Sequence, residues 1–197
     1  MPANTEPSEV WAARPATTVS TPAEANTVLP MSLNDGNVIN AVAAPSTTTT
    51  IEAHPDVPAI VMTRDFRATP AQLVRAHTDP EIFTQWVGPA GSVTEIDHWD
   101  ARTGGSYRYV NQGEGFHGCF HEVGDRLVQT WTWEGMPDFV SLETMTFEDL
   151  GDGRTRLTAF SLCGSFEQRD GMLSSGMEGG VNDGYAKLDG LLAGGGL

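Results

Sequence analysis

The sequence predicts an α+β domain in which a curved, seven-stranded antiparallel sheet wraps around a long C-terminal helix. Three observations predict this fold class. Short apolar runs separated by turn residues fill positions 93–162, two short helical patterns precede them, and an apolar stripe at helical spacing closes the chain. The predicted domain covers residues 53–197, and the elements that define it lie within 59–193.

The first strand and two short helices are expected between residues 59 and 88. The apolar run 59–66 predicts a strand. Thr69 and Pro70 are typical of a helix start, because threonine caps the first turn and proline suits the first helical position. A second short helix begins at Pro80 and ends before Gly88.

Six further strands are expected, each bounded by turn residues. Short glycine- and aspartate-rich loops between alternating strands are typical of an antiparallel meander. The predicted strands are Val93–His98, Ser106–Asn111, Phe116–Val123, Leu127–Trp133, Leu142–Glu148 and Thr155–Leu162.

One continuous C-terminal helix is expected from an apolar stripe with spacings of three and four residues. Glycines at 176, 180 and 184 weaken it, each by about 0.5–1 kcal/mol relative to alanine. They could admit another backbone or a ligand at close range, or they could simply be tolerated. The stripe consists of Leu173, Met177, Val181, Tyr185, Leu188 and Leu192.

Residues 1–52 are expected to form a disordered, low-complexity tail. Alanine, proline, threonine, serine and asparagine dominate it, and its few large apolar side chains cannot offset the entropy of ordering. Two alternatives stay open. Residues 38–42 could form a short docking element, or Met31 could be the true start of the protein.

Charge and cysteine content narrow the partners and the compartment. The formal net charge of −15 argues against nucleic acid and anionic membranes as partners. The two cysteines are too few for a disulfide scaffold, no apolar run is long enough to span a bilayer, and the N-terminus does not resemble a secretory signal. A cytoplasmic protein is therefore expected.

Seven short motifs occur in an order that resembles the SRPBCC (START-like, birch-pollen-allergen-like) superfamily. More narrowly, they resemble the branch named after the activator of the ninety-kilodalton heat-shock protein's ATPase. The resemblance covers residues 59–193 and implies a helix-grip fold with an interior cavity. The motifs are Thr78–Glu81, Trp86–Pro89, Gly104–Tyr109, Phe116–Gly118, Arg126–Val128, Thr144–Glu148 and Arg169–Met172.

Three positions depart from the large aromatic residues that the resemblance implies, namely His77, Gln129 and Val181. A smaller side chain enlarges a cavity unless neighbouring groups fill the space. Gln129 shares strand parity with Trp131, so it is expected to point inward and to need a hydrogen-bond partner. That partner could be a ligand, a water molecule or a neighbouring side chain.

Aromatic and sulfur-containing side chains are the main candidates for contact with a small, mostly apolar ligand. Individually each is typical of an ordinary core, but a concave sheet covered by a helix is difficult to fill completely. The candidate ligand-binding residues are Trp86, Tyr107, Tyr109, Phe116, Gln129, Trp131, Trp133, Met145, Met172, Met177 and Val181.

No metal or cofactor site is expected. His117 and His121 flank Cys119, but residues four apart on a strand lie about 13 Å apart, too far for joint ligation. The glycine pairs at 113–115 and 151–153 fall in hairpin turns, whereas phosphate-binding loops lie between a strand and a helix.

Catalysis rests on fewer residues. Glu143 shares strand parity with Met145 and is therefore a candidate inward-facing carboxylate. Together with His117, Tyr107 or Arg108 it could act as an acid–base pair on a bound carbonyl compound. The alternative is that Glu143 lies in water at a sheet edge.

Three functions follow, in order of support. The first is a binding module for a small apolar or aromatic molecule, without a reaction. The second is a cyclase or dehydratase acting on a polyketide-like carbonyl substrate, with Glu143 and His117 as candidate catalytic residues. The third is activation of a chaperone ATPase, which only the family resemblance implies. A homodimer stays open.

Overall fold

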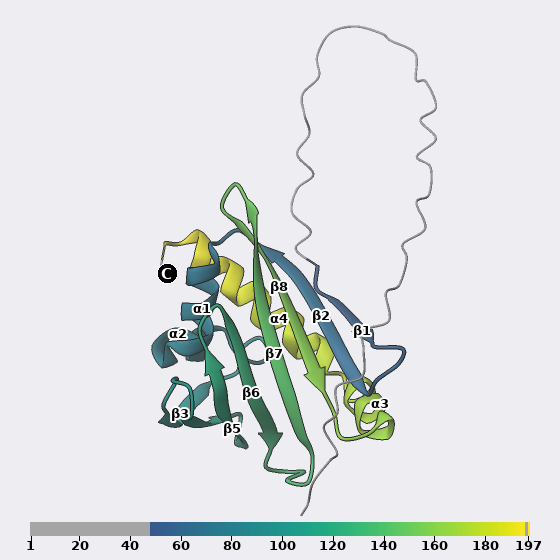
Figure 1. Cartoon of the computed structure of the whole chain (residues 1–197). Helices are drawn as coiled ribbons and strands as arrows, with labels where there is room; N and C mark the ends of the chain where they lie inside the picture. The colour runs from purple at the N-terminus through teal and green to yellow at the C-terminus, as the bar shows by residue number, and fades with distance from the viewer. Residues whose placement is uncertain (1–47, 196) are drawn as a thin grey trace, which may run out of the picture. The chain divides into compact units, whose positions relative to one another are not determined.

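The structure, a computed structural model, describes residues 48–195 and 197 (Figure 1). Most of the predicted tail, including the docking element at 38–42 and the alternative start at Met31, lies outside these residues. The described elements are β1 (Thr50–Ala53), β2 (Ala59–Phe66), α1 (Pro70–Thr78), α2 (Pro80–Trp86), β3 (Thr94–Trp99), β4 (Ser106–Asn111), β5 (Glu114–Val123), β6 (Arg126–Trp133), β7 (Val140–Gly151), β8 (Arg154–Leu162), α3 (Phe166–Ser174) and α4 (Met177–Ala193).

The strands form one antiparallel sheet in the order β1-β2-β8-β7-β6-β5-β4-β3. Helix α4 runs across one face of this sheet, behind β7 and β8 in Figure 1, and α2 packs against α4. We call the face toward α4 the inner face and the opposite one the outer face. The predicted α+β helix-grip class is confirmed, and both short helices after the first predicted strand are present.

Among the residues that the structure describes, the sheet has eight strands, so the predicted number of seven is wrong. The additional strand is β1, which pairs with β2 through Thr50↔Thr63 to Ala53↔Ile60. It begins inside the segment assigned to the tail, 1–52. Because β1 is a short edge strand whose side chains are mostly exposed, it has no alternating apolar pattern that the sequence could reveal.

The predicted long C-terminal helix is present as α4, but its predicted continuity back through Leu173 is wrong, because the chain forms two helices there. Helix α3 ends at Ser174 and α4 begins at Met177. Between them Gly176 adopts a φ of 84°, in the left-handed region that a side chain disfavours. The apolar stripe is real from Met177 onward, but Leu173 belongs to a different helix.

The remaining strands lie within a few residues of their predicted positions. A β-bulge in β5, between Phe120 and Glu122, shifts its register with β6. The bulge breaks the alternation of inner and outer residues, so that Phe120 and Val123 both contact the core although they lie three positions apart. It also adds local twist to the sheet.

Two apolar clusters fill the space beneath the inner face. The larger joins α1, α2 and α4 to the middle strands and includes Leu73, Leu127, Leu157 and Leu188, all nearly inaccessible to solvent. The smaller is aromatic and lies on β4 and β5, around Tyr107, Tyr109 and Phe120. Because these clusters fill the space on either side, the predicted cavity is expected between them.

An ion pair holds α4 to β2 from the inner face. The guanidinium of Arg64, which is 5% exposed, bonds to the carboxylate of Asp189 at 2.5 Å and to the hydroxyl of Thr49 at 3.0 Å. It also lies over the rings of Phe66 and Tyr185. These contacts fix α4 relative to the sheet despite its glycines.

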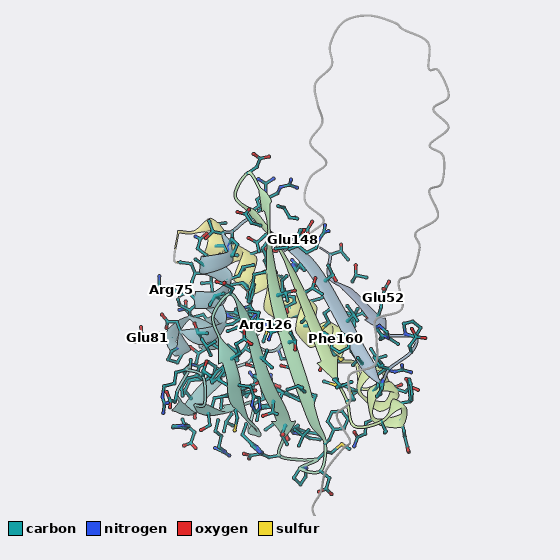
Figure 2. All side chains as sticks on the ribbon, viewed as in Figure 1. Glu52, Arg75, Glu81, Arg126, Glu148 and Phe160 are labelled. Carbon is teal, nitrogen blue, oxygen red and sulfur yellow. The ribbon has the colours of Figure 1, made fainter. Side chains whose placement is uncertain are left out.

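The outer face carries charged and partly exposed side chains. Figure 2 shows Arg126, Glu148 and Phe160 projecting from the side of the sheet opposite α4. Each is followed or preceded on its strand by an inward residue, as the pleat of a strand requires. Among the described helices, none combines the length and the apolar character that crossing a bilayer requires.

Candidate ligand cavity

A cavity with two adjoining compartments lies between the inner face and α4. The first has a volume of about 180 Å³ and is bordered by α1, α2, the middle of the sheet and α4. The second, of about 250 Å³, extends along α4 toward α3. Both compartments are lined mainly by apolar and aromatic side chains. They share the lining residues Met62, Trp86, Val87, Glu143, Ser161, Val181 and Tyr185.

Aromatic side chains form the walls, and hydrogen bonds to backbone carbonyls hold three of them in place. Trp86 Nε1 donates to Ala76 O at 2.9 Å, and Trp99 Nε1 donates to Thr78 O at 2.7 Å. Tyr107 donates its hydroxyl to the carbonyl oxygen of Thr130 at 2.8 Å. Because their polar atoms are engaged in this way, these residues present fixed apolar surface to the cavity.

A carboxylate lies where the compartments meet. Glu143, on β7, borders both of them and accepts a hydrogen bond from Gln129 Nε2 at 2.9 Å. Ser161 lies directly opposite Glu143 in the ladder of β7 and β8. Its hydroxyl is buried and makes no hydrogen bond of good geometry with any described residue. The cavity therefore has a polar centre between two apolar ends.

Burial raises the pKa of Glu143, and the Gln129 amide and the nearby Ser161 hydroxyl act in the opposite direction. Burial also raises the pKa of Tyr107 well above its ordinary value, and the charge of Glu143 adds to this. The tyrosines are therefore neutral at physiological pH. Unlike these tyrosines, Glu143 can carry a charge at physiological pH.

His77 is a neutral member of the cavity wall. Its Nδ1 lies 2.7 Å from Leu73 O, and because a carbonyl oxygen only accepts, Nδ1 carries the proton. Burial lowers the pKa of His77 to about 4, while the bond to Leu73 opposes this shift. The other nitrogen, Nε2, is buried and has no partner among the described residues. His77 thus adds polarity without charge.

Most of the predicted ligand-binding residues border the cavity. Phe116 and Trp133 do not. Phe116 packs between Tyr109 and Trp131, and Trp133 donates to Glu114 at 2.8 Å near the end of the sheet. Those that line one or both compartments are Trp86, Tyr107, Tyr109, Gln129, Trp131, Met145, Met172, Met177 and Val181.

The structure does not bring the predicted acid–base partners together. His117 is exposed, and it lies with Arg108 and Glu134 on the outer face, where Arg108 bonds to Glu134 at 2.7 Å. The hypothesis that His117 or Arg108 acts with Glu143 is therefore wrong, because strand parity puts them on opposite faces of the sheet. Tyr107 is the only one of the three proposed partners that shares the cavity.

Glu143 itself is half-buried and borders the cavity. The alternative of a position at a sheet edge is wrong, because at Glu143 the strand pairs on both sides, with Gln129 of β6 and with Ser161 of β8. The hydrogen bond that Gln129 needs comes from this neighbouring side chain. The prediction that Gln129 points inward is therefore consistent with its place in the cavity wall.

Several lining residues were not among the predicted candidates. Ser161 and Met62 could have been found by extending strand parity from Ala159 and Ile60. Gly184 borders the second compartment, and a Cβ there would approach Trp86 O to 3.1 Å. Its role is thus the close approach of another backbone, one of the two uses considered for these glycines.

No group of three or more potential metal ligands occurs in the part of the chain that the structure describes. Cys119 is exposed and Cys163 is buried, and both are free. Their strands, β5 and β8, are separated in the sheet by β6 and β7.

The fold and cavity define a helix-grip domain of the SRPBCC type. Residues 67–193 match the family model described as Activator of Hsp90 ATPase homolog 1-like protein, so the chain belongs to this family. The predicted family resemblance is confirmed. None of the curated proteins compared by sequence matches the chain.

Solved structures of bacterial proteins share the fold. Protein Ms6760 from Mycobacterium smegmatis has 23% identity and a TM-score of 0.64, with 73% of this chain and 96% of that chain covered. A protein from Rhodobacter sphaeroides has 25% identity and a TM-score of 0.65, covering 74% and 99%. One from Arthrobacter aurescens has 22% identity and a TM-score of 0.66, covering 73% and 91%. At these identities the likeness extends to the fold alone.

Proposed function

We propose that this protein binds a small, mostly apolar or aromatic molecule in the cavity between the sheet and α4. The observation that carries the proposal is the two-compartment cavity itself, walled by aromatic and methionine side chains around one polar centre. Natural ligand sites have this composition, with a few polar groups that fix the orientation of an apolar ligand. The family and fold are consistent with such a role.

The size of the cavity restricts the ligand. An engineered protein cavity of about 150 Å³ is known to hold benzene, so each compartment here has room for roughly one aromatic ring. A molecule with two small apolar groups, joined near Glu143, would fill both compartments. Larger lipids would require α4 to move away from the sheet.

Ligand-dependent thermal stabilisation tests the proposal. A panel of one- and two-ring apolar compounds is mixed with the purified protein, and native mass spectrometry looks for a molecule that co-purifies. At a free concentration of 100 times Kd, a ligand stabilises the folded state by about 2.7 kcal/mol. This corresponds to a rise in Tm of about 5–10 °C for a domain of this size.

A pair of valine variants supplies the control. Val181 borders both compartments, so Val181→Trp is expected to fill the cavity and abolish stabilisation by the panel. Val140 is 47% exposed on the outer face, and Val140→Trp is expected to leave stabilisation unchanged. Two results would contradict the proposal. One is stabilisation by the panel that survives in Val181→Trp, and the other is a parent protein that no compound stabilises.

A second candidate function is supported by Glu143. A partly buried carboxyl with a raised pKa beside a bound ligand can act as an acid or base on a carbonyl compound, as a cyclase or dehydratase requires. Turnover of a polyketide-like carbonyl substrate that is lost in Glu143→Gln, with the fold retained, would favour this enzyme over a binding module. His117 has no part in either version, because it lies on the outer face.

Activation of a chaperone ATPase rests on the family description alone. Mixing the protein with a purified chaperone and measuring ATP hydrolysis tests it independently of the cavity.

We place the binding function in the cytoplasm, which the two free cysteines support.

A further inference from the structure

We propose that the cavity selects a cationic amine whose nitrogen carries an apolar group on each of two sides, with the ammonium bound by Glu143. This inference rests on the proposed binding function and names the chemical class of the ligand. Its basis is the position of one carboxylate in the cavity, the absence of a cation from the described cavity lining, and the aromatic walls.

The position of Glu143 determines where a charged group of the ligand would lie. Glu143 borders both compartments, so an ammonium beside its carboxylate has an apolar space on either side. A molecule with its charge at one end would leave one compartment empty or would bury its charge away from the carboxylate. A central nitrogen with two apolar substituents satisfies both conditions.

The described residues that line the cavity contain no positively charged side chain to balance Glu143. His77 is the only basic residue among them, and it is neutral because burial lowers its pKa to about 4. Among the described residues, the groups that act on the Glu143 carboxylate are both neutral: the Gln129 amide, whose Nε2 lies 2.9 Å away, and the nearby Ser161 hydroxyl. An isolated carboxylate is costly to bury, and a ligand cation would remove that cost.

Cations on neighbouring elements are engaged elsewhere. Arg64 is paired with Asp189 and stacked over Tyr185. The ammonium of Lys187 donates to the carbonyl oxygens of Val87 and Pro89, each at 3.2 Å. Neither side chain borders the cavity, so neither competes with a ligand for Glu143.

The walls are suited to an ammonium ion. The face of an aromatic ring attracts a cation electrostatically, most strongly where water is excluded. The acidity of the protein acts in the same direction at longer range, because its net charge of −15 raises the local concentration of cations and lowers that of anions. The aromatic lining residues are Phe83, Trp86, Trp99, Tyr107, Tyr109, Trp131 and Tyr185.

The test compares two probes of matched shape. Dibenzylamine is protonated at neutral pH and has an aromatic ring on each side of its nitrogen, whereas dibenzyl ether has the same shape without the charge. Isothermal titration calorimetry gives Kd for each. Because a hydrogen bond to a charged group is worth more than one between neutral groups, we expect the amine to bind about tenfold tighter or more.

Variants assign the preference to Glu143. In Glu143→Gln the advantage of the amine over the ether is expected to disappear, while binding of the ether persists. Glu134→Gln removes a carboxylate from the outer face and is expected to leave the advantage intact. Should Glu143→Gln fail to fold, the two probes still test the proposal on the unaltered protein.

The outcomes separate this inference from the proposed function. Equal affinities for the two probes, or an advantage that remains in Glu143→Gln, overturn the cation preference and leave a binding cavity in place. If neither probe binds but other apolar compounds stabilise the protein, the cation preference is again overturned and the binding function stands. If no compound binds, both fail.

Discussion

The two faces of the sheet put the same kinds of side chain in opposite surroundings. On the outer face, Glu134 bonds to Arg108 at 2.7 Å, and this contact with a guanidinium lowers the pKa of the carboxyl. On the inner face, Glu143 has the neutral amide of Gln129 as its partner, and burial raises its pKa. The outer carboxylate is already neutralised, whereas the inner one is available to a ligand.

The comparison shows how much depends on which face a strand residue occupies. Arg108 lies between Tyr107 and Tyr109 on β4, yet it contacts outer carboxylates while its neighbours line the cavity. On each strand, the residues that can contact a ligand in the cavity are therefore the alternate ones that point to the inner face. Matched substitutions on the two faces should differ accordingly.

A large difference is expected between the two kinds of ion pair. Asp189→Ala removes the carboxylate partner of Arg64, which is 5% exposed. Because Asp189 is itself about one-third exposed, we expect a loss of about 2–3 kcal/mol in the free energy of unfolding, less than for a fully buried pair. Urea denaturation measures this loss.

Glu122→Ala is the matched change on an exposed pair. It removes the partner of Arg126, and because solvent screens this pair we expect little change in stability. Similar losses for Asp189→Ala and Glu122→Ala would contradict the assignment of different roles to the two ion pairs.

A second pair of variants compares apolar packing. Leu157 on β8 is 1% exposed and faces the core, whereas Leu142 on β7 is 40% exposed on the outer face. Leu157→Ala should lower the free energy of unfolding by about 2–5 kcal/mol, and Leu142→Ala by about 0.5 kcal/mol or less. Both values come from chemical denaturation at one pH. A larger loss for Leu142→Ala would mean that the outer face is covered by another surface in solution.

The smallest effect concerns the pH dependence of stability. Because the folded state raises the pKa of Glu143, the native protein binds more protons than the unfolded chain between the ordinary carboxyl pKa and the raised one. Stability should therefore fall as pH rises through this window. In Glu143→Gln that contribution is absent, so the variant should gain stability relative to the parent as pH rises from about 4 to 7.

Thermal unfolding of the two proteins across this pH range measures the effect. Glu134→Gln provides the contrast, because the pKa of Glu134 is lowered and its removal should cost stability at neutral pH. A parent protein that gains stability relative to Glu143→Gln as pH rises would contradict the raised pKa.

Local patterns were sufficient to predict most of the fold. Thr69 and Pro70 mark the start of α1 as expected, and Thr69 forms a capping box with Gln72. Strand parity placed Glu143 and Gln129 on the face where the structure has them. These predictions succeed because backbone geometry within one element decides them.

Features that depend on tertiary contacts were not predictable. The edge strand β1 buries too little apolar surface to leave a pattern, and the bulge after Phe120 resets parity without a sequence signal. Parity puts His117 and its neighbour Phe116 on opposite faces of β5, but the sequence does not decide which of the two faces α4 covers. Gly176 did carry a signal for the helix break, but glycines elsewhere in α4, such as Gly184, do not interrupt the helix.

The central claim is that a small apolar molecule occupies the cavity between the sheet and α4, and methionine-methyl NMR tests it most directly. Met62, Met145, Met172 and Met177 border the cavity, whereas Met136 is 54% exposed in the loop after β6. Titration with the compound of the apolar panel that stabilises the protein most should shift the four cavity methyl signals and leave that of Met136 unchanged. Shifts at Met136 alone, or at none of the five, would contradict the account.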